Sequence, residues 1–239
     1  MTTRLPSFLL RKMNIVTAGI VLGAMALSAV VGVYAATSNF AQTITAGTLG
    51  VDIAHPTTYA TVGSPSVTMS SKTFSFTCLT GGNASTGTFG DATANQVIYI
   101  TNPDAADNGW TVSLAGSSTT AVWDGAAADY DFNDASGSGC TDGADASDTV
   151  GGQMTIDPSV ATLATGQCAS CVTTNITKGT SAAFVEGTTN SITLLSGAAG
   201  SDDIGDWKLT GVSISQTIPA QQLPANDYDI DMTLSILAS

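Results

Sequence analysis

The stretch Tyr228-Asp229-Ile230-Asp231-Met232-Thr233-Leu234-Ser235-Ile236 alternates apolar and polar residues near the end of the chain. Successive side chains of a strand point to opposite faces of a sheet, so this pattern predicts a strand with one buried and one solvated face. Shorter runs of the same kind precede it, and none shows the i, i+3, i+4 spacing of an amphipathic helix. Further strands are expected at 49–53, 74–78, 97–100, 110–114, 154–156, 172–176, 192–195 and 207–214.

Eight to ten short strands separated by turn residues are typical of a β-sandwich or barrel. The composition agrees, because Glu186 is the one glutamate among 19 acidic residues. Glutamate and lysine coat helix faces, whereas aspartate favours turns. We therefore expect an all-β fold with a single β-sandwich domain over residues 36–239.

The N-terminal segment has the features of an export signal. Arg4, Arg11 and Lys12 precede an apolar run over 15–36, and Val33-Tyr34-Ala35 places small residues where a signal peptidase cleaves. Residues 1–35 are thus predicted to be a signal peptide. The run is also about 20 residues long, which suits a membrane-anchor helix, so both fates stay open. Either one predicts an extracellular, surface location.

The charge of the exported part excludes two classes of partner. After residue 35 the chain carries three lysines and no arginine against 19 acidic residues. Recognition of phosphate relies on Arg and Lys, so no nucleic-acid partner and no docking on anionic lipid headgroups is expected. A membrane contact is expected only through residues 1–35, if they are not cleaved.

Four cysteines lie in the exported part. An even count in an oxidising compartment predicts two disulfides, and of the three pairings we favour Cys168–Cys171 and Cys78–Cys140. The alternative is a zinc site at Cys168 and Cys171, for which His55 is the one histidine ligand available. A redox role for Cys-x-x-Cys requires a thioredoxin-like βαβ context, which the strand pattern does not predict.

Residues 124–152 hold seven aspartates and are predicted to form a long ordered loop or insertion. Within them, Asp129-Tyr130-Asp131-Phe132-Asn133-Asp134 places oxygen donors at alternate positions, as at the opening of a calcium loop. Calcium is therefore the expected cofactor, and its coordination shell would be completed by Asp124, Asp142 or Asp145. The alternative is a solvated acidic loop. The candidate ligands are Asp129, Asp131, Asn133 and Asp134.

Catalysis is not expected. His55 lies in His-Pro-Thr-Thr, without a nucleophile motif around it. The tryptophans are instead candidate binding residues. Trp110 and Trp207 lie on alternating strands and are expected to pack in the core. Trp123, at the edge of the acidic loop, is expected either to pack or to stack on a sugar ring.

Two segments carry a resemblance to known surface proteins. Ile98-Tyr99-Ile100-Thr101-Asn102, followed by Gly109-Trp110-Thr111-Val112-Ser113-Leu114, resembles the first signature of WxL-domain proteins. The segment from Ile218-Pro219-Ala220 to the final alternating strand resembles that family's closing segment. Met232 stands where the second tryptophan of that family is found, and Trp207-Lys208-Leu209 lies upstream. This resemblance implies non-covalent attachment to a cell wall.

The start of the exported part carries a second resemblance. The segment Phe40-Ala41-Gln42-Thr43-Ile44-Thr45-Ala46-Gly47-Thr48-Leu49-Gly50-Val51-Asp52-Ile53 is similar to the opening of the camelysin and TasA-like matrix-fibre proteins. This likeness implies assembly in which an N-terminal strand of one subunit completes the sheet of the next. Both families imply a jelly-roll or immunoglobulin-like sandwich.

Together these observations predict a non-catalytic surface protein that associates with a cell-wall polymer or surface glycan, or acts in adhesion. The first alternative is a self-associating fibre subunit, in which 37–53 swaps into a neighbour. The second alternative is a carbohydrate-binding module that uses Trp123.

Overall fold

The computed structural model describes residues 42–103, 108–143, 150–202 and 204–238. The expected signal or anchor segment at 1–35 lies outside the described residues. Thr45–Ser239 forms a compact unit, and the fold below is that of this unit. Within the described part of the chain, no helix has the length and apolar character needed to cross a membrane.

The fold is all-β, as the sequence predicted. Antiparallel strands and three single-turn 3-10 helices make up its regular structure. The elements are β1 (Gly50–Ala54), η1 (Gly81–Asn83), β2 (Ser85–Phe89), η2 (Ala92–Ala94), β3 (Val97–Asn102), β4 (Trp110–Gly116), β5 (Val122–Trp123), β6 (Tyr130–Asp131), η3 (Ser136–Ser138), β7 (Gln153–Asp157), β8 (Thr162–Thr165), β9 (Ile176–Lys178), β10 (Ala182–Ala183), β11 (Ser191–Gly197), β12 (Gly205–Thr210), β13 (Val212–Thr217) and β14 (Met232–Ala238).

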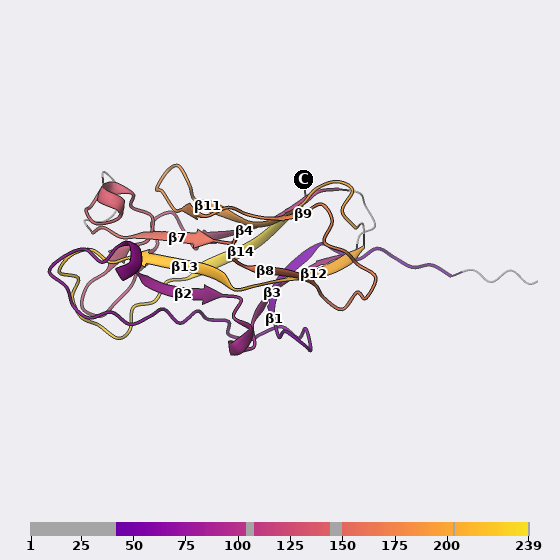
Figure 1. The fold of residues 1–239 in the computed structure, drawn as a ribbon, viewed down its shortest axis with the longest axis horizontal. Coiled ribbons are helices and arrows are strands. Elements are labelled where there is room, and N and C mark those ends of the chain that lie inside the picture. The colour runs from indigo at the N-terminus through magenta and orange to yellow at the C-terminus, as the bar shows by residue number, and fades with distance from the viewer. Residues whose placement is uncertain (1–41, 104–107, 144–149, 203, 239) are drawn as a thin grey trace, which may run out of the picture. The chain divides into compact units, whose positions relative to one another are not determined.

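The strands form four antiparallel sheets, in the orders β1-β3-β12-β8, β10-β7-β13-β2, β14-β4-β11-β9 and β5-β6. The first two sheets run end to end, because β12 leads directly into β13 (Figure 1). The joint is Gly211, whose φ of +81° is a left-handed conformation that favours glycine. The single strand expected over 207–214 is therefore two strands in two sheets.

The core lies between the β4 sheet and the β12 sheet. Trp110 of β4 and Trp207 of β12 are 1% and 0% exposed, with ring centroids 5.6 Å apart. Gly197 of β11 makes this contact possible, because a Cβ there would lie 2.5 Å from the Trp110 ring. Burying an aromatic side chain of this size contributes at least about 1.5–3 kcal/mol. Sheets facing each other across such a core are consistent with the expected β-sandwich.

Three expected strands differ from the structure. Residues 74–78 form no strand, and Phe74 and Phe76 point to solvent with 42% and 77% exposure. The strand expected at 172–176 begins at its last residue, Ile176. The alternating stretch that ends the chain pairs as β14 only from Met232 onward, while Asp229 makes a single bridge to Asp124. Residues 76–77 bend and residues 174–175 form a turn, so neither of these two segments is extended throughout. Pairing as a strand also needs a neighbouring strand with free hydrogen-bonding groups.

Both favoured disulfides are present. Cys78–Cys140 joins Cα atoms 5.5 Å apart, and Cys168–Cys171 joins Cα atoms 5.4 Å apart. Such bonds indicate an oxidising, extracellular environment. Cys140 fixes the acidic insertion at 124–152, which also contains β6 and η3; its residues 144–149 lie outside the described part.

Candidate binding cavity

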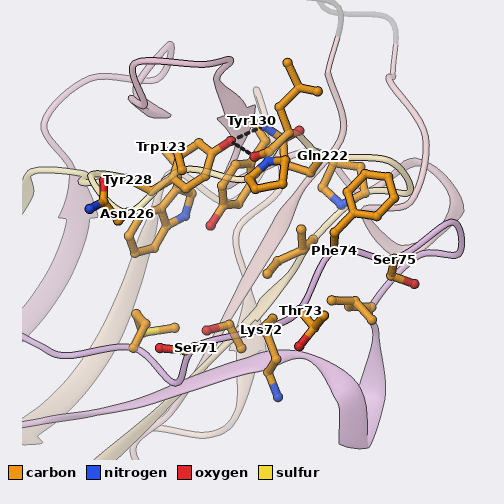
Figure 2. A pocket seen from close by; sticks show the side chains of 18 of the residues that line it. Ser71, Lys72, Thr73, Phe74, Ser75, Trp123, Tyr130, Gln222, Asn226 and Tyr228 are labelled. Atoms are coloured by element: carbon orange, nitrogen blue, oxygen red, sulfur yellow. Dashed lines mark hydrogen bonds between the residues drawn. The ribbon is translucent and has the colours of Figure 1, made fainter.

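The candidate site is a cavity of about 290 Å³ between two loop segments, 69–75 and 218–228, beside the β5–β6 hairpin. We call it the loop cavity. Figure 2 shows Trp123, Tyr130, Gln222 and Tyr228 along one side. Ser71, Lys72 and Thr73 lie along the other, and the Lys72 amine points away from the aromatic side.

Antiparallel pairing of β5 with β6 builds the aromatic side. Trp123 is the pairing partner of Tyr130, and their rings stack with centroids 5.9 Å apart and 9° between their planes. Tyr228 meets Tyr130 edge to face at 5.1 Å. Burial, and then the neighbouring Tyr228, raise the pKa of the Tyr130 phenol well above its ordinary value. This hydroxyl therefore stays protonated and neutral at physiological pH.

A hydrogen-bond network fixes the aromatic side in place. The Trp123 Nε1 donates to Gln216 Oε1 at 2.9 Å, and Gln216 Nε2 donates to the Asp131 carbonyl at 3.0 Å. Gln222 Nε2 donates to the Ala128 carbonyl at 3.1 Å. The Tyr228 hydroxyl donates to the Leu223 carbonyl at 2.6 Å. Side chains held in this way form a largely pre-formed wall, as is usual for small-molecule sites.

Neutral polar groups, together with the Lys72 amine, complete the polar lining. Asn226, Ser71 and Thr73 are exposed, and in the described structure their side chains make no hydrogen bond. Although the chain carries 19 acidic residues, none of the described lining residues is an aspartate or a glutamate. The cavity therefore offers hydroxyl groups opposite an aromatic wall and an amide beside that wall, without an ionised carboxylate.

A second cavity of about 440 Å³ adjoins the first and is mainly apolar. We call it the open-edge cleft, because it lies beside β14, an edge strand of its sheet. Ile53, Ile214 and Leu234 line it from three different sheets. Trp123 and Tyr228 line both cavities.

The three candidate tryptophans have different surroundings. Trp110 and Trp207 are buried against each other, and a buried ring cannot stack on a ligand from solvent. Trp123 lines the loop cavity, although it is only 8% exposed. Of the other lining residues, Tyr228 begins the alternating stretch that the sequence analysis singled out, whereas Gln222 and Asn226 lie in an irregular segment whose pattern marks no binding residue.

The structure does not bring the candidate calcium carboxylates to one point. No three carboxylates of this loop lie within 4.8 Å of one another among the described residues. Asp131 Oδ1 accepts the N–H groups of Phe132 and Asn133, and Asp134 accepts those of Ser136 and Gly143. These carboxylates therefore cap local backbone. Asp129 accepts the Gly125 N–H, while Asp145 lies outside the described residues. Calcium binding stays a prediction.

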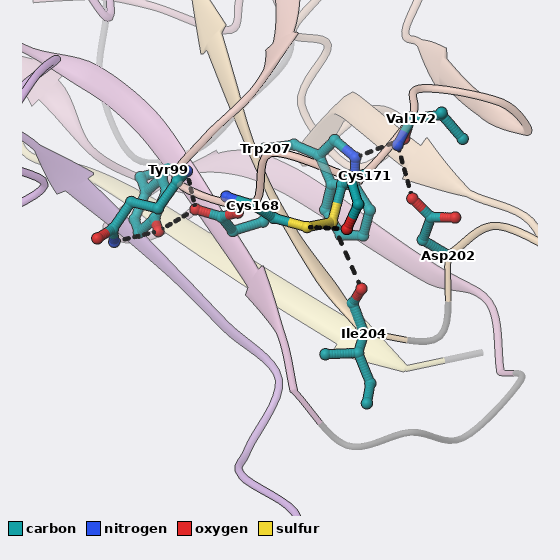
Figure 3. Close-up of a disulfide and its surroundings, with 10 residues drawn as sticks. Tyr99, Cys168, Cys171, Val172, Asp202, Ile204 and Trp207 are labelled. Carbon is teal, nitrogen blue, oxygen red and sulfur yellow. Dashed lines mark hydrogen bonds between the residues drawn. A yellow bond between two sulfur atoms is a disulfide. The ribbon is translucent and has the colours of Figure 1, made fainter.

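A different group, Cys168, Cys171 and Asp206, has the spacing of metal ligands. Its two sulfur atoms are bonded to each other, and a metal binds the thiolate rather than the disulfide. Asp206 is 7% exposed and accepts the N–H groups of Gln167 and Cys168 at 2.6 and 2.7 Å. Through these two bonds the carboxylate holds the disulfide loop, which Figure 3 shows, against β12.

His55 is not a member of that group, so the structure does not supply the histidine of the zinc alternative. Its Nδ1 accepts the N–H groups of Thr57 and Thr58, each at 3.3 Å, within its own turn. Among the described residues this ring therefore stabilises a local turn.

Comparisons with known proteins assign no family to the chain. No family model matches it, and neither the curated proteins nor the solved structures include a significant match.

Proposed function

We propose that this chain is a non-catalytic extracellular surface protein that holds a cell-wall polymer or surface glycan non-covalently in the loop cavity. One observation carries the proposal: an aromatic wall of Trp123, Tyr130 and Tyr228 faces exposed hydroxyl groups across the cavity, and the Asn226 amide lies beside that wall. A sugar ring presents apolar C–H faces and a hydroxyl-rich edge. Aromatic side chains and neutral hydrogen-bonding groups complement these two surfaces.

Binding rather than cleavage is the activity that the lining favours. Hydrolysis of a glycosidic bond uses a pair of carboxyl groups on either side of it. The described lining of the loop cavity holds no carboxylate. Any glycan in the cavity would therefore meet groups that orient it, without a general acid or a nucleophile.

The WxL-like reading of the sequence is compatible with this proposal. In that hypothesis the strand that carries Trp110 and the final strand together form the wall-binding surface. These strands are β4 and β14, which pair along the length of β4. Because Trp110 is buried, its part in such a surface would be to support the sheet from within. We further propose that the sandwich is of the jelly-roll or immunoglobulin-like type that this resemblance implies.

Exposed lining residues provide the test. Asn226→Ala should weaken binding on an array of neutral, acetamido and acidic glycans by roughly threefold to tenfold, the usual value of one hydrogen bond. Asn190→Ala, another exposed asparagine, is the matched control because Asn190 does not line the cavity. Equal binding by both variants would contradict the site. Trp123→Ala is less suitable, since losing a large buried side chain costs about 3–5 kcal/mol of stability.

A second candidate function is assembly into fibres, and two observations favour it. Residues 42–48 are exposed and lie in no sheet, with Ile44 87% exposed. The open-edge cleft lies beside β14, an edge strand of its sheet. Addition of a strand to such an edge is a common mode of association between chains.

Deleting residues 37–48 separates the two functions. If the segment completes a neighbour's sheet, the full chain should sediment as polymers and the deletion variant should remain monomeric. Glycan binding through the loop cavity should survive the deletion. Polymers that persist without residues 37–48 would exclude this segment as the exchanged strand.

A further inference from the structure

The rim of the loop cavity carries a pair of exposed aromatic rings. Phe74 lines the cavity and is 42% exposed, while Phe76 lies outside the lining and is 77% exposed. Their rings pack edge to face with centroids 5.0 Å apart. Leu223, on the facing loop segment, also lines the cavity and is 50% exposed. Exposed apolar groups that gather at one place mark an interaction site.

This rim is held in position. The Ser75 hydroxyl accepts the Thr77 N–H at 3.1 Å, which closes a small turn between the two rings. The Ser75 carbonyl accepts the Gln221 N–H at 2.8 Å, and this bond ties the two loop segments together. Immediately beyond, Cys78 is fixed by its disulfide to Cys140. The two rings are therefore presented to solvent by a braced segment.

The cavity alone accommodates only a small ligand, since its volume of about 290 Å³ is at the lower end for small-molecule sites. Part of a longer ligand would have to extend out of the cavity onto the surface. Phe74 stands at the boundary and Phe76 beyond it, so the two rings form a path from the cavity to the surface. Resting on the proposed glycan-binding function, we infer that the ligand is an oligosaccharide chain, with one part in the cavity and the next rings stacked over Phe74 and Phe76.

The chemistry of this path suits a neutral chain. The Phe74 and Phe76 side chains carry no charge and no hydrogen-bonding group, so they contact the C–H faces of sugar rings without selecting particular hydroxyls. The site thus divides into a cavity that selects one ring by its polar groups and a platform that lengthens the contact.

Ligand length tests the inference. We would titrate the full chain with cello- and chito-oligosaccharides of two and six rings. In the series that binds, the six-ring chain should bind about tenfold more tightly than the two-ring chain. Phe76→Ser should abolish this gain and leave the two-ring affinity unchanged. Phe76→Tyr, which keeps a flat ring, should retain the gain.

Val160→Ser is the matched control, because Val160 is 62% exposed and does not line the cavity. Equal affinities for the two lengths in the unsubstituted chain, or a gain that survives Phe76→Ser, would overturn the inference while leaving glycan binding intact. Binding to neither series at either length, with no signal on the glycan array, would overturn the proposed function together with it.

Discussion

At the scale of single residues, the Asp206 carboxylate is a buried polar group that connects several elements of the fold. It accepts the Tyr99 hydroxyl and the N–H groups of Gln167 and Cys168. Asp206 is 7% exposed and Tyr99 is 8% exposed. Three donors to one buried carboxylate offset the cost of removing its charge from water. This arrangement joins β3, β12 and the Cys168–Cys171 loop.

The Tyr99 phenol predicts how stability depends on alkaline pH. Burial, and then the bond to Asp206, raise the pKa of Tyr99 from 10.0 to about 12. The unfolded chain therefore loses this proton first, so the stabilisation from this group is complete below pH 10 and is lost between pH 10 and 12. Tyr130, whose pKa is also raised, acts in the same direction.

Melting temperatures of the unsubstituted chain and of Tyr99→Phe, measured from pH 9 to 12, test this. The variant should start less stable, through loss of a hydrogen bond, and should decline less steeply. Parallel curves would show that Tyr99 ionisation does not contribute to alkaline unfolding.

The candidate calcium ligands make a separate prediction. Asn133 Oδ1 is buried and has no hydrogen-bond partner among the described atoms. If this oxygen and its neighbours bind calcium, a chelator should lower the melting temperature by several degrees, because an ion that binds only the folded state stabilises it. Asn133→Ala should remove the response to chelator. Identical melting with and without chelator would contradict a stabilising calcium site at Asn133.

At the scale of elements, the loop segment 69–79 depends on cross-links rather than on a sheet. Its backbone is fixed by Ser70 to β2, by Ser75 to Gln221, and by Leu79 to Ile218. The Cys78–Cys140 disulfide anchors it to the acidic insertion. One wall of the loop cavity thus depends on a covalent bond that reaches across 62 residues.

Replacing each disulfide by a pair of serines should have unequal effects. The Cys78–Cys140 loop spans 62 residues, and the entropy of closing it corresponds to about 4 kcal/mol. The Cys168–Cys171 loop spans 3, which corresponds to about 2 kcal/mol. Urea unfolding measures both values, and loss of the first bond should also weaken glycan binding. A larger loss from the second bond would contradict this ranking.

The sequence predicted the strands in which apolar and polar residues alternate because one face is buried. β4, β11 and the β14 end of the chain were expected because one face of each is packed. β2 was missed, since Ser-Thr-Gly-Thr-Phe carries almost no apolar signal and is ordered by its pairing with β13. Conversely, 74–78 shows alternation without a partner strand, and its exposed phenylalanines belong instead to the rim of the cavity.

At the scale of the whole molecule, the all-β fold class and the cysteine pairing were predictable from the sequence, whereas the binding cavity was not. The even cysteine count predicted two disulfides, and of the three possible pairings the favoured one is present. The loop cavity brings together segments about 150 residues apart, through bonds such as Gln221 N–H to the Ser75 carbonyl. A sequence read along its length marks Trp123 as a candidate, but it does not reveal that Asn226 and Thr73 share its cavity.

The central claim, that the loop cavity holds a glycan, is tested most directly by cosedimentation with insoluble cell-wall fragments. We expect the chain to pellet with the fragments and to stay in solution without them. The double variant Thr73→Ala/Asn226→Ala should remain in the supernatant, while Asn190→Ala should pellet like the unsubstituted chain. Pelleting of the double variant to the same extent, or no pelleting of the unsubstituted chain with the fragments, would contradict the account.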